Sequence, residues 1–522
     1  MRRSSVLEER TMTETSQPSN LNMQQLQRVF ALYSAGQFNE ALSLAGELDR
    51  KYPNSPLLLN LMGAVHAALT NYDASVASFE KAIELSPEVP DTYFHLGNTL
   101  FEKGDLTAAI GCFRRAVELR SEYAEAHNKL CQTLERSNLI DELEAALALA
   151  KEKCPDDYPA LRLREAELLK RKKDYAAARE RLESSAWQSA DAETQEAAAY
   201  LLCDLCDRLD EPDAAFGYAV EANRICAAGL SAQRMDRGAY FRLIDELSEV
   251  FAPERVAKWS ECNIDDHSPD PVFLVGFPRS GTTLLNTILL SHTDISVTEE
   301  EPTVFALESA IREMTGRSLN GLSALDGKQI ESLRRVYIDE LDKYLDAGKR
   351  PKRVVDKLPL NLVQAGLIYR VFPDARYIFA QRHPCDAVLS CYMRAFIMNE
   401  GMVNCLDLAG AARLYDRVMQ LWAHYQDVLP MKVHTVQYES LIRDFDSTVS
   451  ACLEFLGMDW DDGVRDYVKT ARRSGQITTP SYDQVTQALY KGASGRWQRY
   501  RQHLEPVLPV LLPWAERMGY RE

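Results

Sequence analysis

The 522-residue chain is longer than one hydrophobic core usually supports, so its length predicts two or three domains. Its formal net charge of −17 at pH 7 argues against nucleic-acid binding or attachment to anionic membranes, because both partners repel an acidic surface. Hydrophobic residues make up 46% of the chain, but no stretch reaches the roughly 20 consecutive apolar residues of a membrane-spanning helix. Any anion site must therefore be a local concentration of positive charge.

The N-terminal segment and the cysteines indicate the compartment. Two arginines near the start are followed by polar residues rather than the apolar core of a secretory signal, which predicts a disordered, cytoplasmic lead-in at residues 1–22. Eleven cysteines are scattered without a disulfide framework, and one CxxC pair, Cys203 and Cys206, lies in the helical-looking run AAAYLLCDLCDRL. Since zinc needs two further ligands, we interpret this pair as helix packing and predict no metal site.

The first part of the chain repeats with a period of 34 residues. Small residues, aromatic residues and prolines each recur at fixed positions. Small residues let two helices approach closely, aromatic side chains fill the space between them, and a proline ends the second helix of a pair. The recurring positions are Gly63 and Gly97; Phe79 and Phe113; Ala82, Ala116 and Ala150; and Pro53, Pro87 and Pro155.

This pattern resembles tetratricopeptide repeats and predicts an all-α solenoid over residues 23–260, whose later helical pairs lose the register. Four clear copies are expected, at residues 23–56, 57–90, 91–124 and 125–158. The resemblance implies a concave surface that holds a peptide or partner protein, with a structural arm or a dimer contact as the alternative. A polar, proline-containing segment at 261–271 is the predicted linker to a second domain at 272–522.

The second domain opens on a candidate phosphate site. The apolar run Val272–Phe277 predicts a buried parallel strand that leads through PRSGTT into the helical stretch LLNTILLSH. In such a unit the loop glycines, the backbone N–H groups and the helix N-terminus together bind an anion. Gly276 and Gly281 have the G-x-x-x-x-G spacing, but Thr282 stands where nucleoside triphosphatases carry lysine, and the cation lies in the loop at Arg279.

These departures favour a ligand without a γ-phosphate. The later strand ARYIFAQR is also not followed by an aspartate that could hold magnesium, which argues against a kinase or a GTPase and for a metal-free transfer. From Lys469 to Glu522 there are nine Lys and Arg against four Asp and Glu, although the chain is acidic overall. Local positive charge thus gathers near the C-terminus.

From Pro271 to Glu522 the chain resembles the sulfotransferases that use 3′-phosphoadenosine 5′-phosphosulfate (PAPS). The loop FPRSGTT resembles their 5′-phosphosulfate loop, and RHPCDAVLS resembles their 3′-phosphate motif. The resemblance implies an α/β, P-loop-like domain with a mainly parallel sheet and PAPS as co-substrate. The residues that it implies for nucleotide binding are Arg279, Ser280, Gly281, Thr282, Thr283, Arg382, Ser390, Tyr438, Lys491, Gly492 and Arg496.

An arginine in the loop brings the pattern closest to the tyrosylprotein sulfotransferases and their bacterial relatives. The resemblance places the catalytic base at Glu300, within HTDISVTEEEPTV, but Glu299 and Glu301 flank it and the choice among the three stays open. A carboxylate there would take the proton of the acceptor hydroxyl. The resemblance also assigns stabilisation of the leaving group to three residues, Arg279, Lys357 of DKLP and Ser481 of SYDQV.

The predicted function is therefore transfer of a sulfuryl group from PAPS to a hydroxyl acceptor. That acceptor is a protein tyrosine or another hydroxyl presented by a carrier, with the repeats holding the peptide or protein that bears it. The alternative is a repeat scaffold whose sulfotransferase-like domain binds the nucleotide without turnover. The nearby histidines, His292 and His383, are interpreted as packing residues.

Overall fold

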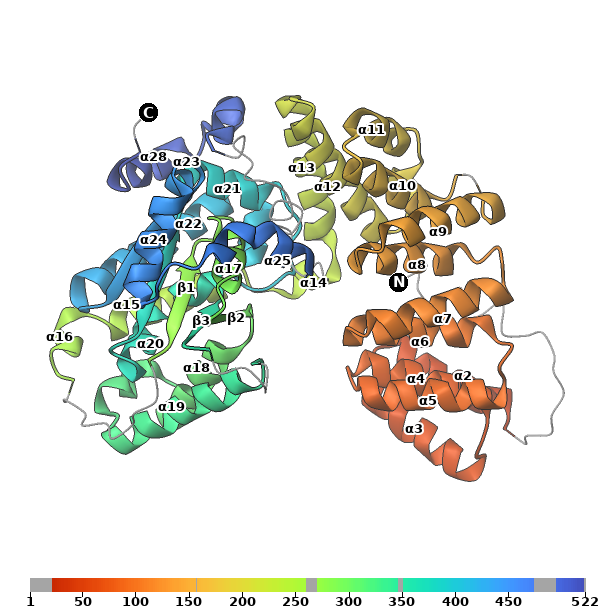
Figure 1. Ribbon diagram of the computed structural model, residues 1–522. Helices are drawn as coiled ribbons and strands as arrows, with labels where there is room; N and C mark the ends of the chain where they lie inside the picture. Colours follow the sequence, from red (N-terminus) through yellow and green to blue (C-terminus); the bar gives the residue numbers. More distant parts are fainter. Residues whose placement is uncertain (1–20, 156, 260–269, 346–350, 474–493, 521–522) are drawn as a thin grey trace. The chain divides into compact units, whose positions relative to one another are not determined.

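The structure of the protein is a computed structural model (Figure 1). Its chain divides into two compact units, Met1–Ala190 and Asp191–Glu522. The structure describes residues 21–155, 157–259, 270–345, 351–473 and 494–520. Within this described part of the chain, no helix combines the length and the apolar character needed to cross a bilayer.

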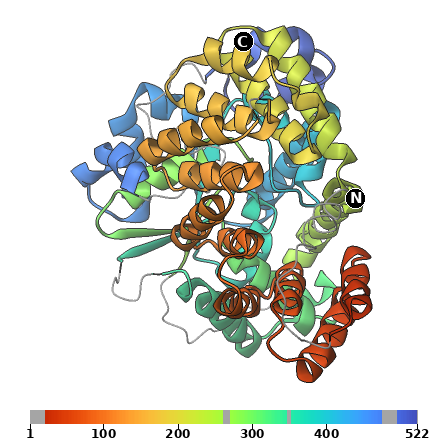
Figure 2. The same ribbon diagram turned by 90° about the vertical axis from the view of Figure 1, so that its right-hand side faces the viewer.

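Helices in pairs form the first unit, seen in red to orange in Figure 2. Each of the four predicted 34-residue copies contains one pair, and a fifth pair follows, so the predicted helical solenoid is confirmed. The helices are α2 (Met23–Ser34), α3 (Phe38–Lys51), α4 (Pro56–Ala68), α5 (Tyr72–Leu85), α6 (Pro90–Lys103), α7 (Leu106–Leu119), α8 (Ala124–Arg136), α9 (Ile140–Lys153), α10 (Pro159–Arg171) and α11 (Tyr175–Glu183).

The repeating glycines are explained by the aromatic rings that face them. A Cβ atom added at Gly63 would lie 2.8 Å from the ring of Phe79, and one added at Gly97 would lie 2.7 Å from the ring of Phe113. Both phenylalanine side chains are buried. The two helices of a pair therefore touch where one contributes no side chain and the other contributes a large one, as the 34-residue pattern predicts.

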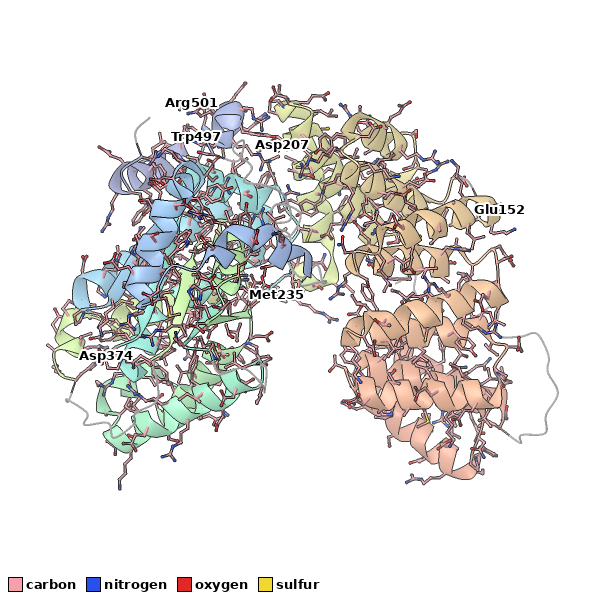
Figure 3. The ribbon with its side chains drawn as sticks, in the orientation of Figure 1. Glu152, Asp207, Met235, Asp374, Trp497 and Arg501 are labelled. Atoms are coloured by element: carbon pink, nitrogen blue, oxygen red, sulfur yellow. The ribbon has the colours of Figure 1, made fainter. Side chains whose placement is uncertain are left out.

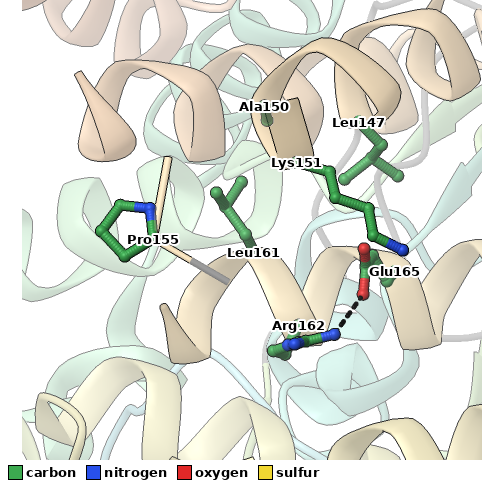
Figure 4. Close-up of a pocket in the computed structure, with 7 residues that line it drawn as sticks. All are labelled: Leu147, Ala150, Lys151, Pro155, Leu161, Arg162 and Glu165. Atoms are coloured by element: carbon green, nitrogen blue, oxygen red, sulfur yellow. Dashed lines mark hydrogen bonds and ion pairs between the residues drawn. The ribbon is translucent and has the colours of Figure 1, made fainter. Parts of the chain in front are cut away.

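A small hollow lies between α9 and α10 (Figure 4). Its volume of about 10 Å³ is room for one water molecule at most. An ion pair of 3.4 Å between Arg162 and Glu165 crosses one side of it. The lining residues are Leu147, Ala150, Lys151, Pro155, Leu161, Arg162 and Glu165. The hollow is too small for a substrate.

The second unit begins with helices that pack onto its sheet-containing part. The amide of Asn223 donates to the carbonyl of Tyr392 over 2.8 Å, and Cys203 and Cys206 are buried. These helices are α12 (Ala192–Arg208), α13 (Pro212–Ala228), α14 (Leu230–Arg234), α15 (Ala239–Val250) and α16 (Pro253–Val256). The boundary between the two compact units therefore lies after Ala190, whereas the sequence predicts that the repeat domain ends at residue 260 and the second domain begins after residue 271. Residues 260–269 lie outside the described part of the chain.

Five parallel strands form one sheet in the order β2-β3-β1-β4-β5. This confirms the predicted parallel α/β domain. The chain leaves β1, adds β3 and β2 on one side of it, and then adds β4 and β5 on the other, so the direction of winding changes at β1. The strands are β1 (Val272–Gly276), β2 (Ile295–Glu299), β3 (Arg353–Lys357), β4 (Arg376–Gln381) and β5 (Lys432–Gln437).

Helices cover both faces of the sheet (Figure 1). Alternate residues of β1 enter two separate cores: Val272 and Leu274 pack with α17, α24 and α25, whereas Phe273 and Val275 pack with α18–α22 and α28. The helices that follow β1 are α17 (Thr282–Leu290), α18 (Thr303–Met314), α19 (Gly327–Asp342), α20 (Ala365–Val371), α21 (Pro384–Tyr392), α22 (Leu408–Val428), α23 (Tyr438–Arg443), α24 (Phe445–Leu456), α25 (Tyr467–Arg473), α27 (Arg501–Leu504) and α28 (Leu508–Arg517).

Candidate active site

The candidate site lies at the carboxyl ends of the five strands. Because the strands are parallel and in register, with Gly276 opposite Ala380 and Glu299 opposite Lys357, these ends meet at one edge of the sheet. The phosphate loop follows β1, the acidic turn of residues 299–301 begins at the last residue of β2, and Lys357 ends β3. In α/β sheets with a change of winding direction, this edge is where ligands bind.

The phosphate loop joins β1 directly to the N-terminus of α17, as predicted. Gly281 has a φ of 93°, and a Cβ atom there would lie 2.6 Å from the ring of Tyr438, at the end of β5. A Cβ at Gly276 would lie 2.5 Å from the carbonyl oxygen of Ala380. The two glycines are therefore required by the close approach of β4 and β5, and the loop lies against the ends of both strands.

The two predicted nucleotide motifs meet at Arg279. Its Nε donates to the Ser390 hydroxyl over 3.0 Å, and the Arg382 guanidinium donates to its carbonyl oxygen over 2.9 Å. The Arg382 guanidinium also lies 4.9 Å from the centre of the Tyr438 ring. Residues predicted to hold the 5′ and 3′ ends of one nucleotide thus form a single connected group.

Positive charge is concentrated around this group. Burial and the neighbouring guanidinium groups of Arg394, Arg382 and Arg496 lower the pKa of Arg279 to about 9. Arg279 remains protonated at neutral pH, but repulsion among the cations makes its charged form less favourable. An anion bound here would relieve that repulsion, which is the electrostatic signature of an anion site.

Lys357 and the acidic turn form the second part of the site. The Lys357 side chain is fully buried, and its ammonium group donates to Glu300 over 2.7 Å and to Glu299 over 3.2 Å. The backbone N–H of Glu300 donates to the Lys357 carbonyl over 2.7 Å. The Glu300 side chain is 43% exposed and that of Glu299 is 35% exposed, so both carboxylates are accessible while their cation is not.

The third acid of the turn is in a different setting. Burial and the charge of Glu299 raise the pKa of Glu301. The structure brings Glu299 and Glu300 together on Lys357, and the choice among the three acids as the base stays open. The single positive charge of the ammonium group offsets one of the two negative charges it contacts.

The C-terminal segment is described only in part. Ser481, Lys491 and Gly492 lie outside the described residues, so their predicted roles stay predictions. The Arg496 Nε donates to the carboxylate of Asp207, on α12, over 3.0 Å, and Figure 3 shows Asp207 beside the segment that carries Trp497. Arg496 thus adds to the positive charge around Arg279, while its guanidinium contacts an acidic side chain.

Two residues that the motifs did not indicate support this region. Asp386 accepts the backbone N–H groups of Gly495 and Trp497 over 2.8 and 2.7 Å, which fixes the segment around Arg496. Arg394 adds to the cationic group and pairs with Asp204 of α12 over 2.5 Å. An acid inside the RHPCDAVLS motif and an arginine just beyond it were the available signals.

Both histidines have packing roles. His292 Nδ1 accepts the Asp294 backbone N–H over 3.1 Å, and its Nε2 lies 3.1 Å from the Asp459 carbonyl. His383 stacks on the Trp497 ring with 5.0 Å between ring centres and accepts the Cys385 N–H at the start of α21.

A parallel sheet with a glycine-containing loop after its central strand, beside converging arginines, is an α/β domain with a candidate anion site. Comparison with known proteins shows which family this part of the chain is similar to. Residues 271–462 match the model of the sulfotransferase family. Residues 63–104 and 97–137 match the model of the TPR repeat, which confirms the repeats in the first unit.

Three relatives share parts of the chain. An uncharacterised protein of Aquifex aeolicus is 28% identical over 327 residues, which cover 61% of this chain and 42% of that protein. The protein-tyrosine sulfotransferase of Drosophila melanogaster is 24% identical over 243 residues, 43% of this chain and 46% of that enzyme. Nodulation protein NoeE of Sinorhizobium fredii is 30% identical over 220 residues, 37% of this chain and 52% of NoeE. The chain therefore spans about half the length of these relatives.

Proposed function

We propose that the protein transfers a sulfuryl group from PAPS to a hydroxyl acceptor. The observation that carries the proposal is the contact of Arg279 with both Ser390 and Arg382, which joins the two nucleotide motifs at the sheet edge that also carries the pair formed by Lys357 and Glu300. The sulfotransferase-family match of residues 271–462 supports the same reaction class.

The donor would be held by residues from several strand ends. The loop from Arg279 to Thr283 and the N-terminus of α17 suit the 5′-phosphosulfate, because N–H groups and a guanidinium converge there. Arg382 and Ser390 suit the 3′-phosphate, and the Tyr438 ring suits the adenine. Lys491, Gly492 and Arg496 are proposed to complete this half of the site.

The chemistry assigned to the chain is a proton transfer and a charge stabilisation. The acceptor oxygen bonds to sulfur while the bond from sulfur to the bridging oxygen of the donor breaks, and adenosine 3′,5′-bisphosphate leaves with the electron pair. The Glu300 carboxylate takes the acceptor proton. Lys357, Arg279 and Ser481 stabilise the charge that develops on the leaving oxygen.

The acceptor class follows from the relatives and the repeats. Protein-tyrosine sulfotransferases are among the relatives, which supports a protein tyrosine or another carrier-presented hydroxyl as the acceptor. The TPR-type helices suit the binding of the protein or carrier that bears it. A cytoplasmic location is part of the proposal, and it is supported by the ten cysteines of the described residues, all free thiols.

The test is transfer of labelled sulfate from PAPS to a panel of tyrosine peptides and hydroxylated oligosaccharides. Glu300→Gln should lower kcat by roughly 10²–10⁴-fold, because the amide cannot take the proton, and should leave the calorimetric affinity for adenosine 3′,5′-bisphosphate unchanged. Glu299→Gln is the matched variant that decides between the two acids. Tight nucleotide binding without transfer to any acceptor would instead support a nucleotide-binding repeat scaffold.

A further inference from the structure

A buried carboxylate lies directly beneath the acidic turn. Asp356 precedes Lys357 on β3 and is 1% exposed. Its Oδ2 accepts the Thr303 hydroxyl over 2.5 Å and the Tyr337 hydroxyl over 2.9 Å. Thr303 is the first residue of α18 and Tyr337 lies in the middle of α19, so one carboxylate oxygen ties both helices to β3.

A second polar side chain lies on the same face of the sheet as this carboxylate. Thr298 lies opposite Asp356 in the β2–β3 ladder, so the two side chains are on the same face of the sheet. Asp356 Oδ1 and Thr298 Oγ1 are both buried, and neither has a hydrogen-bond partner among the described residues. Burying a polar group without a hydrogen-bond partner lowers the stability of the folded state. Apolar side chains at these positions would therefore give a more stable fold.

Two adjacent residues of β3 hold the two ends of the acidic turn. Lys357 binds the start of the turn through its ammonium group and through its carbonyl oxygen, which accepts the Glu300 N–H. Asp356 binds the end of the turn through Thr303, three residues after Glu300. Glu300, which Lys357 holds, has a φ of 60°, a conformation that non-glycine residues keep only where their surroundings hold it.

We propose that Asp356 is a positioning residue that holds the turn of residues 299–301 so that the Glu299 and Glu300 carboxylates stay on Lys357. It acts through Thr303 and Tyr337 and does not touch the substrates. The expected effect of Asp356 on kcat rests on the proposed sulfuryl transfer. Its effect on the conformation of the turn does not, and that effect is measured separately.

Hydrogen exchange of the full-length protein measures the positioning directly. Thr303→Val and Tyr337→Phe each remove one hydroxyl at nearly constant shape, and each should speed exchange in peptides spanning residues 299–303 by about tenfold, the effect of one lost buried hydrogen bond. Peptides spanning the phosphate loop, residues 276–283, should exchange as in the unaltered protein. Tyr425→Phe is the matched control, because Tyr425 is also buried and donates to a backbone carbonyl, that of Val363.

Replacement of Asp356 itself gives the second readout. Asp356→Ala should speed exchange at residues 299–303 and lower kcat at least tenfold without changing the KM for PAPS, and Asp356→Asn should restore both because its amide oxygen still accepts the two hydroxyls. If Asp356→Ala does not fold, the two hydroxyl variants decide. The proposal is overturned if exchange at 299–303 is unchanged in these variants or rises equally at 276–283. An absence of any sulfuryl transfer would contradict the proposed function but leave this exchange result to stand.

Discussion

Two candidate-site residues have a backbone conformation that their side chains disfavour. Arg279 and Glu300 have φ values of 68° and 60°, which cost about 1–3 kcal/mol in non-glycine residues. Each is held by a hydrogen bond to a distant residue: the Arg279 carbonyl by Arg382, and the Glu300 N–H by Lys357. Six other non-glycine residues of the described chain have similar φ values, so it is these tertiary contacts, and not the φ values alone, that set Arg279 and Glu300 apart.

The buried Asp356 gives a prediction for stability against pH. Burial raises the pKa of Asp356 to about 6, with a further contribution from Glu301, while the hydrogen bonds from Thr303 and Tyr337 oppose the rise. At pH values between the pKa of Asp356 in the unfolded chain and its higher pKa in the folded state, the folded state binds more protons than the unfolded state. The stability that this group contributes is therefore present at low pH and is lost as the pH rises through the folded pKa. From pH 4.5 to 7.5 the free energy of unfolding should fall by about 2 kcal/mol through this residue.

Urea unfolding of the unaltered protein and of Asp356→Asn across this range measures the effect, because the amide does not titrate. The difference in unfolding free energy between the unaltered protein and Asp356→Asn should change by about 2 kcal/mol between pH 4.5 and 7.5. Asp461→Asn is the control: hydrogen bonds from the Thr293 and Gly463 backbone lower the pKa of Asp461 to about 2, below the range. Parallel curves for the unaltered protein and Asp356→Asn would contradict the prediction.

At the scale of elements, helix pairs and strand ends are shaped by the absence of side chains at a few glycines. In the repeats the glycine makes room for a ring, and in the sheet domain Gly276 and Gly281 make room for a neighbouring strand and for Tyr438. Both arrangements bring backbones closer than a Cβ atom permits.

The contact between Gly97 and the Phe113 ring predicts the effect of adding one methyl group at Gly97. Gly97→Ala should destabilise the first unit by about 1–3 kcal/mol, because the new Cβ would meet the buried Phe113 ring at 2.7 Å. Gly111→Ala is the matched control in the partner helix: nothing lies within 4 Å of its added Cβ, so alanine should stabilise α7 by about 1 kcal/mol. Thermal unfolding compares the two, and equal shifts would show that the ring contact does not limit packing.

At the scale of the whole molecule, the second compact unit contains more than the sulfotransferase-family match. Helix α12 supplies Asp204 and Asp207, which pair with Arg394 and Arg496 of the cationic group. These carboxylates hold two guanidinium groups that lie close enough to Arg279 to lower its pKa, so we expect the proposed nucleotide site to depend on a helix that precedes the family match in sequence.

Truncation tests this dependence. A chain that begins at Asp191 should bind adenosine 3′,5′-bisphosphate as the full chain does, because the second unit is compact by itself. A chain that begins at Pro271 lacks α12 and should bind at least about tenfold more weakly, because Arg394 and Arg496 lose the carboxylates that hold them in position. Calorimetric titration of both gives the affinities. Equal affinity in the two would show that α12 is dispensable and would favour the domain limit predicted near 271.

The sequence by itself determined the helical repeats, the parallel α/β domain and the strand–loop–helix around Arg279, because periodicity and glycine spacing are local properties of the chain. The resemblance of its motifs to a known family also points to Glu300 and Lys357 as candidate site residues. Only the tertiary structure joined Arg279 to Ser390 and Arg382, placed Asp356 beneath the acidic turn and brought α12 to the cationic group. Such contacts join residues far apart in the chain, and no local pattern specifies which buried carboxylate will meet which hydroxyl or guanidinium.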